Sequence, residues 1–178
     1  MDRRYLLIIA ITIICCLNLY IISDVSDIVG SASIDCNNYT FSAPEGFVLY
    51  ETAQKYTEIH DSSSGMNIYI NPSISKSDTY ANKIKEISDS NSSDSNSSNS
   101  EYTLLSKGTL DVEGIKVDSV YYQPPSGENR ALFYFDKMND HFKILITDFD
   151  YDSDRNKTIE HVTDIVSSLR INYKIKNK

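Results

Sequence analysis

The stretch ALFYFDKMNDHFKILITDF, from Ala131 to Phe149, decides the fold class. Its two apolar segments, 131–135 and 142–149, flank the polar turn 137–140, and this arrangement is typical of a β-hairpin. The second segment is apolar on both faces, with Phe142, Ile144 and Ile146 on one and Leu145 and Phe149 on the other. We therefore expect it to be a central strand of a sheet that is covered on two sides.

The segments upstream of this hairpin extend the same pattern. Tyr102 to Val112 and Ile115 to Tyr122 flank a Glu113-Gly114 turn and predict a second hairpin. Residues 66–71 alternate between apolar and polar side chains, which is typical of a half-buried strand. A turn that contains Pro and Gly precedes another strand-like segment from Phe47 to Tyr50. The chain thus predicts an antiparallel sheet.

Two helices are expected to flank this sheet. Ser77 or Asp78 can cap the first, in which Tyr80, Ile84 and Ile87 share one face. The second runs from about Asp154 to Leu169 and is expected to lie across the sheet. Its apolar stripe consists of Ile159, Val162, Val166 and Leu169. The predicted fold is α+β, a central antiparallel sheet flanked by helices in an α/β/α sandwich.

The expected domain spans residues 38–171 and contains one low-complexity segment. Residues 88–100 are all Ser, Asn or Asp, so no apolar group offsets the entropy cost of ordering them. We predict a flexible, disordered loop there. Residues 172–178 form a short basic tail.

The N-terminus has the pattern of a membrane anchor. Arg3 and Arg4 precede 5–22, an uncharged and mostly apolar segment. A helix of this length is roughly 27 Å long, near the thickness of the hydrocarbon core. The arginines keep the N-terminus cytoplasmic, so the rest of the chain is expected to be extracytoplasmic. We predict a signal anchor at 1–22 and a juxtamembrane linker at 23–37; cleavage near Gly30-Ser31-Ala32 would instead yield a secreted domain.

Composition excludes several classes of function. The 178 residues include 17 Lys plus Arg and 25 Asp plus Glu, a net charge of -8 that argues against nucleic-acid binding. The three Cys lack metal-ligand spacing, which excludes a disulfide scaffold or a zinc ribbon. The sequence contains no nucleophile elbow, zinc-protease, P-loop or dinucleotide-binding motif. We expect no enzymatic activity and no cofactor apart from a candidate calcium ion.

Three segments carry a family resemblance. They are YTFSAPEGF (39–47), GTLDVEGIKV (108–117) and TIEHVTDIVSSLRI (158–171), and with the order of elements they resemble the PsbP-like superfamily. That superfamily includes the extrinsic PsbP protein of photosystem II, the Ran-binding Mog protein and many exported prokaryotic relatives. The resemblance covers residues 38–171 and implies a binding or assembly module without a shared active site, so no functional residue is carried over. The Ser/Asn/Asp insert and the anchor depart from the better-known members, and a photosystem or Ran role is therefore not inferred.

The strongest candidate site is an acidic cluster where the last long strand runs into the closing helix. Its members are Asp148, Asp150, Asp152 and Asp154, which fall at ligand positions 1, 3, 5 and 7 of a calcium loop. The glycine expected at position 6 is Ser153, and position 12 is Ile159. The alternative is that Asp152 or Asp154 caps the helix while the others are solvated.

Other features leave their alternatives open. Cys36 can pair between chains or stay a free thiol. Glycosylation sequons occur at Asn38, Asn91, Asn96 and Asn156, of which Asn91 and Asn96 lie in the predicted loop. The aromatic residues Tyr121, Tyr122, Phe133, Tyr134 and Phe135 form either an interface or the core of a Trp-less sheet.

The sequence favours a non-enzymatic, membrane-tethered, extracytoplasmic binding or assembly module. Its expected partners are the membrane, through the N-terminal helix, and a protein near the outer face of the membrane. The alternative is an ion- or ligand-binding sensor domain that uses the acidic cluster 148–154.

Overall fold

The computed structural model describes residues 33–36, 39–52, 56–72, 74–75, 77–90 and 102–171. The predicted anchor, residues 91–100 of the predicted loop and the basic tail lie outside these ranges. Among the described residues, no helix combines the length and the hydropathy needed to span a membrane.

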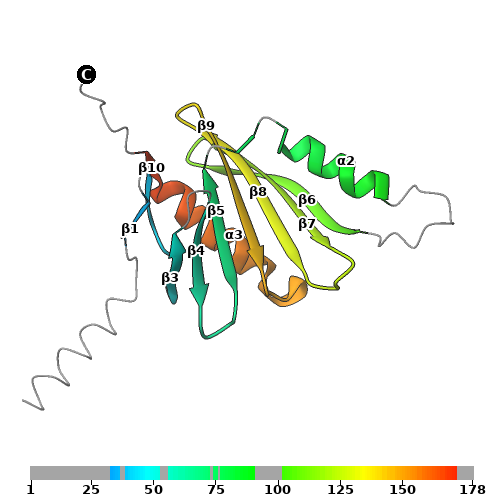
Figure 1. Cartoon of the computed structure of the whole chain (residues 1–178), viewed down its shortest axis with the longest axis horizontal. Coiled ribbons are helices and arrows are strands. Elements are labelled where there is room, and N and C mark those ends of the chain that lie inside the picture. The colour runs from blue at the N-terminus through cyan, green and yellow to red at the C-terminus, as the bar shows by residue number, and fades with distance from the viewer. Residues whose placement is uncertain are drawn as a thin grey trace, which may run out of the picture.

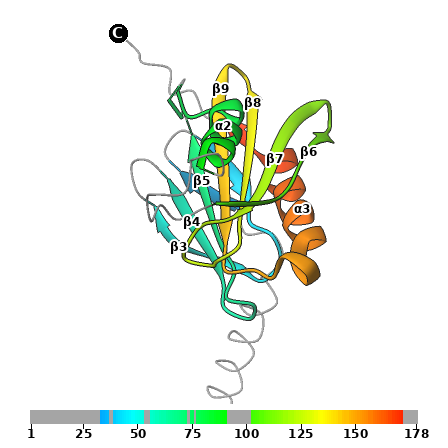
Figure 2. The same cartoon turned by 90° about the vertical axis from the view of Figure 1, so that its right-hand side faces the viewer.

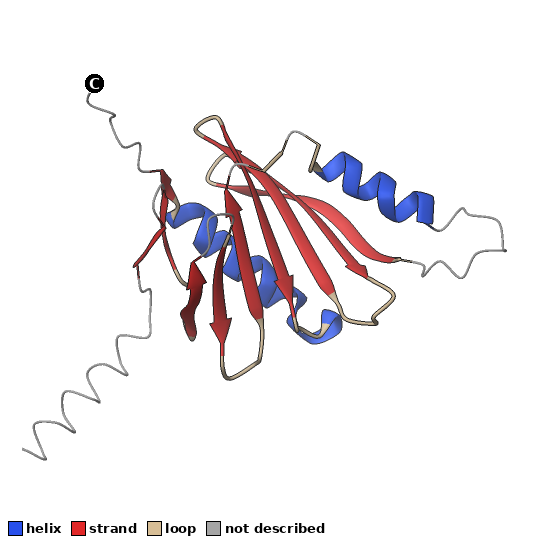
Figure 3. Cartoon of the chain, viewed as in Figure 1, coloured by secondary structure: helices blue, strands red, loops and turns tan. Residues whose placement is uncertain are grey.

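A seven-stranded antiparallel sheet forms the centre of the molecule, in the order β3-β4-β5-β9-β8-β7-β6 (Figures 1 and 3). β9 is the middle strand, as the two-faced apolar pattern of its sequence predicted. The strands are β3 (Phe47–Thr52), β4 (Thr57–Asp61), β5 (Asn67–Pro72), β6 (Thr103–Val112), β7 (Ile115–Gln123), β8 (Arg130–Lys137) and β9 (Asp140–Thr147).

Two-residue turns close both predicted hairpins. Glu113 and Gly114 join β6 to β7, and Met138 and Asn139 join β8 to β9; all four have positive φ. Such turns match the right-handed twist of the strands that they connect. A second, smaller sheet consists of β1 (Ser33–Cys36), β2 (Tyr39–Ser42) and β10 (Arg170–Ile171), so β1 forms within the stretch predicted as linker.

Helix α3 (Tyr151–Ser168) lies behind the seven-stranded sheet in Figure 1, and we call the side that it covers the back face. Val162, Ile165 and Val166 of α3 are fully buried in the main core, together with Leu169 just beyond the helix. Ile159, the first member of the predicted stripe, is half-buried. The sheet contributes five fully buried isoleucines: Ile59, Ile68, Ile70, Ile144 and Ile146.

Helix α2 (Tyr80–Ser90) lies on the opposite side, which we call the front face (Figure 2). Its predicted apolar face is confirmed, since Tyr80, Ile84 and Ile87 pack in a second, smaller core. The sheet residues of this core come from β7, β8 and β9: Val120, Tyr122, Leu132, Tyr134 and Leu145. The fold is therefore α+β, with one helix on each face of the sheet.

Both predicted helix starts were wrong by a few residues. The Thr79 hydroxyl, rather than Ser77 or Asp78, accepts the Asn82 amide at the start of α2. α2 also continues to Ser90, which includes the first three residues of the predicted loop. α3 begins at Tyr151 rather than Asp154, because its first two turns are polar and carry little of the apolar stripe that located the helix.

Candidate functional site

The structure places the four aspartates of the acidic cluster in different roles. Asp148 follows β9 with a φ of 59° and accepts hydrogen bonds from Asn67 Nδ2 (2.8 Å) and Thr147 Oγ1 (2.6 Å). Asp150 is the N-cap of α3 and accepts the amides of Asp152 and Ser153. The capping interpretation is therefore correct for this segment, although the capping residue is Asp150 rather than Asp152 or Asp154.

Three of the four aspartates nevertheless line one open hollow of about 460 Å³. Asp148, Asp150 and Asp154 contribute to it, whereas Asp152 does not. Asp154 pairs with Lys157 Nζ at 2.9 Å, and this contact helps to lower the pKa of the Asp154 carboxyl. Among the described residues, no three His, Cys, Asp or Glu side chains converge closely enough to hold a metal. Calcium binding stays a prediction, which calorimetric titration of the full-length chain with Ca²⁺ would test.

A more enclosed pocket of about 440 Å³ lies on the front face, beside the start of α2. Residues from the loop before α2 and from β7, β8 and β9 form its wall. The polar side chains that line it include Asp78, Tyr80, Asp118, Tyr134, Asp136 and His141. Several of them are paired: His141 Nδ1 contacts Asp136 Oδ1 at 2.5 Å, and Thr109 donates to Asp118 Oδ1 at 2.7 Å.

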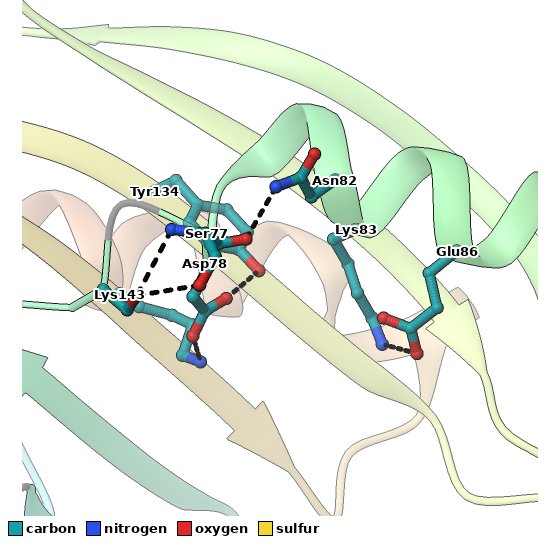
Figure 4. A network of polar contacts seen from close by, with 8 residues as sticks. Ser77, Asp78, Asn82, Lys83, Glu86, Tyr134 and Lys143 are labelled. Carbon is teal, nitrogen blue, oxygen red and sulfur yellow. Dashed lines mark hydrogen bonds and ion pairs between the residues drawn. The ribbon is translucent and has the colours of Figure 1, made fainter.

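Asp78 is the centre of the polar network beside this pocket (Figure 4). Its carboxylate forms an ion pair with Lys143 Nζ and accepts a hydrogen bond from the Tyr134 hydroxyl at 3.4 Å. Burial, followed by the charge of Asp78, raises the pKa of Tyr134, so this hydroxyl remains protonated and can donate. The network ties the start of α2 to the central strands β8 and β9.

The front face continues beyond α2 onto β3, β4 and β5, and no described helix covers this part in Figure 1. We call it the open front face. Direct cross-strand pairing assigns its residues, because Glu58 lies opposite Tyr69, which lies opposite Leu145 of the smaller core. The residues of the open front face are Val48, Tyr50, Glu51, Tyr56, Glu58, His60, Asn67 and Tyr69.

Aromatic rings and hydrogen bonds order the open front face. The Tyr56 and Tyr69 rings meet edge to face at 5.9 Å, and the Tyr50 ring lies 6.4 Å from the His60 ring. His60 Nδ1 donates to Asn67 Oδ1 at 2.6 Å, and Asn67 in turn donates to Asp148. This surface combines rings with hydrogen-bonding groups, a composition suited to binding.

The aromatic residues that the sequence singled out lie in the cores and not on the open front face. Tyr121, Tyr122, Phe133, Tyr134 and Phe135 are all buried, so they form the cores, which was one of the two alternatives. The tyrosines of the open front face were missed because they are spread over three segments between 50 and 69. Tyr69 does alternate with Ile68 and Ile70, and that signal marked it as facing away from the core.

The remaining candidates can be placed in part. Cys36 ends β1. Asn156 is exposed on α3, whereas Asn38, Asn91 and Asn96 lie outside the described residues. His161 faces Phe47 at 5.0 Å with the rings edge to face.

No protein-family model and no curated protein sequence matches this chain. Solved structures do match. The solution structure of cyanobacterial PsbP from Synechocystis sp. PCC 6803 is 14% identical, with 80% of this chain and 91% of that chain covered and a TM-score of 0.47. A crystal structure from Bacteroides thetaiotaomicron is 12% identical, with a TM-score of 0.50; it covers 82% of this chain, which spans half of that one.

A protein of unknown function from Pseudomonas aeruginosa is 9% identical, with 76% of this chain and 95% of that chain covered and a TM-score of 0.42. At these identities each match is a likeness of fold. The likeness to cyanobacterial PsbP is one of fold, and membership of the PsbP-like superfamily stays a prediction.

Proposed function

We propose that this chain is a non-enzymatic binding module that holds a protein partner against its open front face. One observation carries the proposal. Every back-face isoleucine of β4 and β5 is fully buried, whereas the edge strand β3 exposes large apolar side chains, with Tyr50 71% and Val48 52% exposed on the front face and Leu49 49% exposed on the other face. Large apolar side chains gathered on one surface are typical of interaction sites.

The edge strand β3 is built for side-chain recognition rather than for strand addition. Its pairing with β4 shifts between Leu49 and Glu51, so Tyr50 has no opposite residue and forms a bulge. Bulges at sheet edges disrupt the regular ladder that an added strand would need. The partner is therefore expected to contact the projecting rings rather than the backbone of β3.

The proposal includes a tether and a location. Residues 5–22 would anchor the chain in the membrane with the domain on the extracytoplasmic side, which the apolar run and the preceding arginines support. Protease added to intact cells should then remove a C-terminal tag, and alkaline washing should leave the chain in the membrane fraction. A tag that is protected until the cells are lysed would contradict this topology.

Crosslinked capture with the tagged full-length chain tests the binding function. We expect Tyr50→Ala to lose at least nine-tenths of the partner that the natural chain captures, because it removes the most exposed ring of the surface. Leu104→Ala is the matched control, since Leu104 is an exposed apolar residue on β6, at the opposite edge of the sheet. Equal capture by all three chains would contradict the proposal.

The pocket beside α2 favours a second candidate, a module for a small ligand. Its volume of about 440 Å³ and its mixture of rings and carboxylates fit an organic molecule with an apolar body. A thermal-shift screen of small organic compounds on the full-length chain would test it. Stabilisation that disappears in Tyr80→Ala would support this candidate.

A further inference from the structure

Two carboxylates face each other on the open front face without a described counter-charge. Glu51 of β3 lies directly opposite Glu58 of β4 in the strand register. Like charges in this position destabilise a strand pair. None of the ion pairs formed among the described residues involves either glutamate. The open front face therefore offers negative charge to whatever docks on it.

Tyrosine hydroxyls hold the two carboxylates in place. The Tyr56 hydroxyl donates to Glu51 Oε2 at 3.3 Å, and the Tyr69 hydroxyl bonds to Glu58. The charge of Glu51 raises the pKa of Tyr56, while burial and then Glu58 raise the pKa of Tyr69 to about 12. Both hydroxyls are thus protonated at neutral pH and can act as donors.

The same face holds a complete version of this arrangement under α2. Lys83 Nζ lies 4.9 and 4.7 Å from the ring centroids of Tyr102 and Tyr122, and 2.9 Å from Glu86 Oε1. Figure 4 shows the contact between Lys83 and Glu86. There, one ammonium group forms cation–π contacts with two tyrosine rings and an ion pair with a carboxylate.

The open front face has three tyrosine rings and two carboxylates, but among the described residues it lacks a cation like the one that Lys83 supplies under α2. Lys143, which projects from the same face of β9, is already paired with Asp78. A docking segment that brings its own cations would complement the charge of this surface. Its apolar side chains would contact Val48 and the Tyr50 ring.

We propose that the open front face docks a basic segment of a partner protein, with a Lys or Arg side chain between Glu51 and Glu58 against the tyrosine rings. This inference rests on the proposed function and names the chemistry of the partner. The net charge of -8 would also speed the approach of a basic partner.

A synthetic hexapeptide of alternating Lys and Val, blocked at both ends, is the probe. Its binding to the full-length chain in detergent is measured by fluorescence anisotropy, and its position by NMR shifts of the Val48 methyl groups. We expect Glu51→Gln combined with Glu58→Gln to weaken binding at least tenfold. The control combines Asp152→Asn with Glu160→Gln, which also removes two negative charges but from exposed positions on α3, and it should change binding less than twofold.

Equal weakening by both double variants would show non-specific charge attraction and overturn the inference, as would an unshifted Val48. Two other results, in which the open front face is occupied by something other than a basic partner, would also overturn the inference. If a chain ending at Ile171 binds the probe tenfold more tightly, the chain's own basic tail is the occupant. If light scattering shows a dimer that Glu51→Gln with Glu58→Gln dissociates, a second copy is the occupant.

The crosslinked capture separates this inference from the proposed function. Capture that is lost in Tyr50→Ala and also in the Glu51 and Glu58 double variant supports both. Capture that is lost in Tyr50→Ala but unchanged in the double variant leaves the binding function standing and overturns the basic partner.

Discussion

The two faces of β4, β5 and β9 are made by alternating residues of the same strands but have opposite characters. On the back face, side chains such as Ile59 and Ile68 are fully buried beneath the second layer of the fold. On the front face, their sequence neighbours His60 and Tyr69 are partly exposed and polar at their tips. Because strand side chains alternate, one short segment can supply stability on one side and recognition on the other.

The front face itself divides in the same way. Under α2, Tyr122 and Tyr134 are buried and their surroundings include Lys83 and Lys143. Beyond α2, the tyrosines are half-buried or exposed and the nearby charges are carboxylates. Similar residue types thus serve as core where a helix covers them and as surface where no described helix does.

The largest expected effect on stability comes from comparing two neighbouring residues of β9, one on each face of the sheet. Ile146→Ala should cost about 2–5 kcal/mol of unfolding free energy, because it leaves a cavity in the fully buried back face. Leu145→Ala, on the half-buried front face, should cost about 1–2 kcal/mol. Urea denaturation of the full-length chain, followed by tyrosine fluorescence, measures both. Equal losses would show that the two faces do not differ in this way.

A smaller effect is expected at the buried hydroxyl pair between the sheet and α3. Thr158 Oγ1 donates to the Arg155 carbonyl (2.7 Å), so the Tyr121 hydroxyl, 2.8 Å away, donates to Thr158. Thr158→Val should cost about 1–2 kcal/mol, since it leaves the buried Tyr121 donor without its partner. Tyr121→Phe should cost less, because the Thr158 proton keeps its acceptor. The same denaturation experiment decides, and a double variant that costs the sum of both would argue against coupling.

The sequence predicted those parts of the structure in which buried and exposed side chains alternate regularly. The sequence predicted the hairpins, the central position of β9 and the apolar sides of both helices, because burial makes apolar residues recur at regular intervals along the chain. The open front face was not predicted, since the pairing of Glu51 with Glu58 depends on a bulge at Tyr50 that no local pattern announces. The cap of α3 was assigned to the wrong aspartate, because spacing along the chain does not show that Asp150 turns back to cap the helix.

Acidification should weaken the contact between β3 and α3. The His161 ring packs against Phe47, and burial lowers its pKa despite the opposing charges of Glu160, Asp164 and Asp61. The unfolded chain therefore binds a proton more readily than the folded one, and unfolding free energy should fall as pH drops below about 6.5. His161→Gln should flatten that slope in denaturation measured between pH 5 and 8. An unchanged slope would mean that other groups carry the pH dependence.

The smallest effect on stability is expected where the effect on binding is largest. Tyr50 lies on a bulge of the edge strand with 71% of its surface exposed, so Tyr50→Ala should change unfolding free energy by less than about 0.5 kcal/mol. The same variant is expected to lose partner capture. Denaturation and capture on one preparation therefore test whether the ring is kept for recognition. A loss of stability comparable to that of Leu145→Ala would instead assign Tyr50 to the fold, and the division between a stabilising back face and a binding front face would not hold at β3.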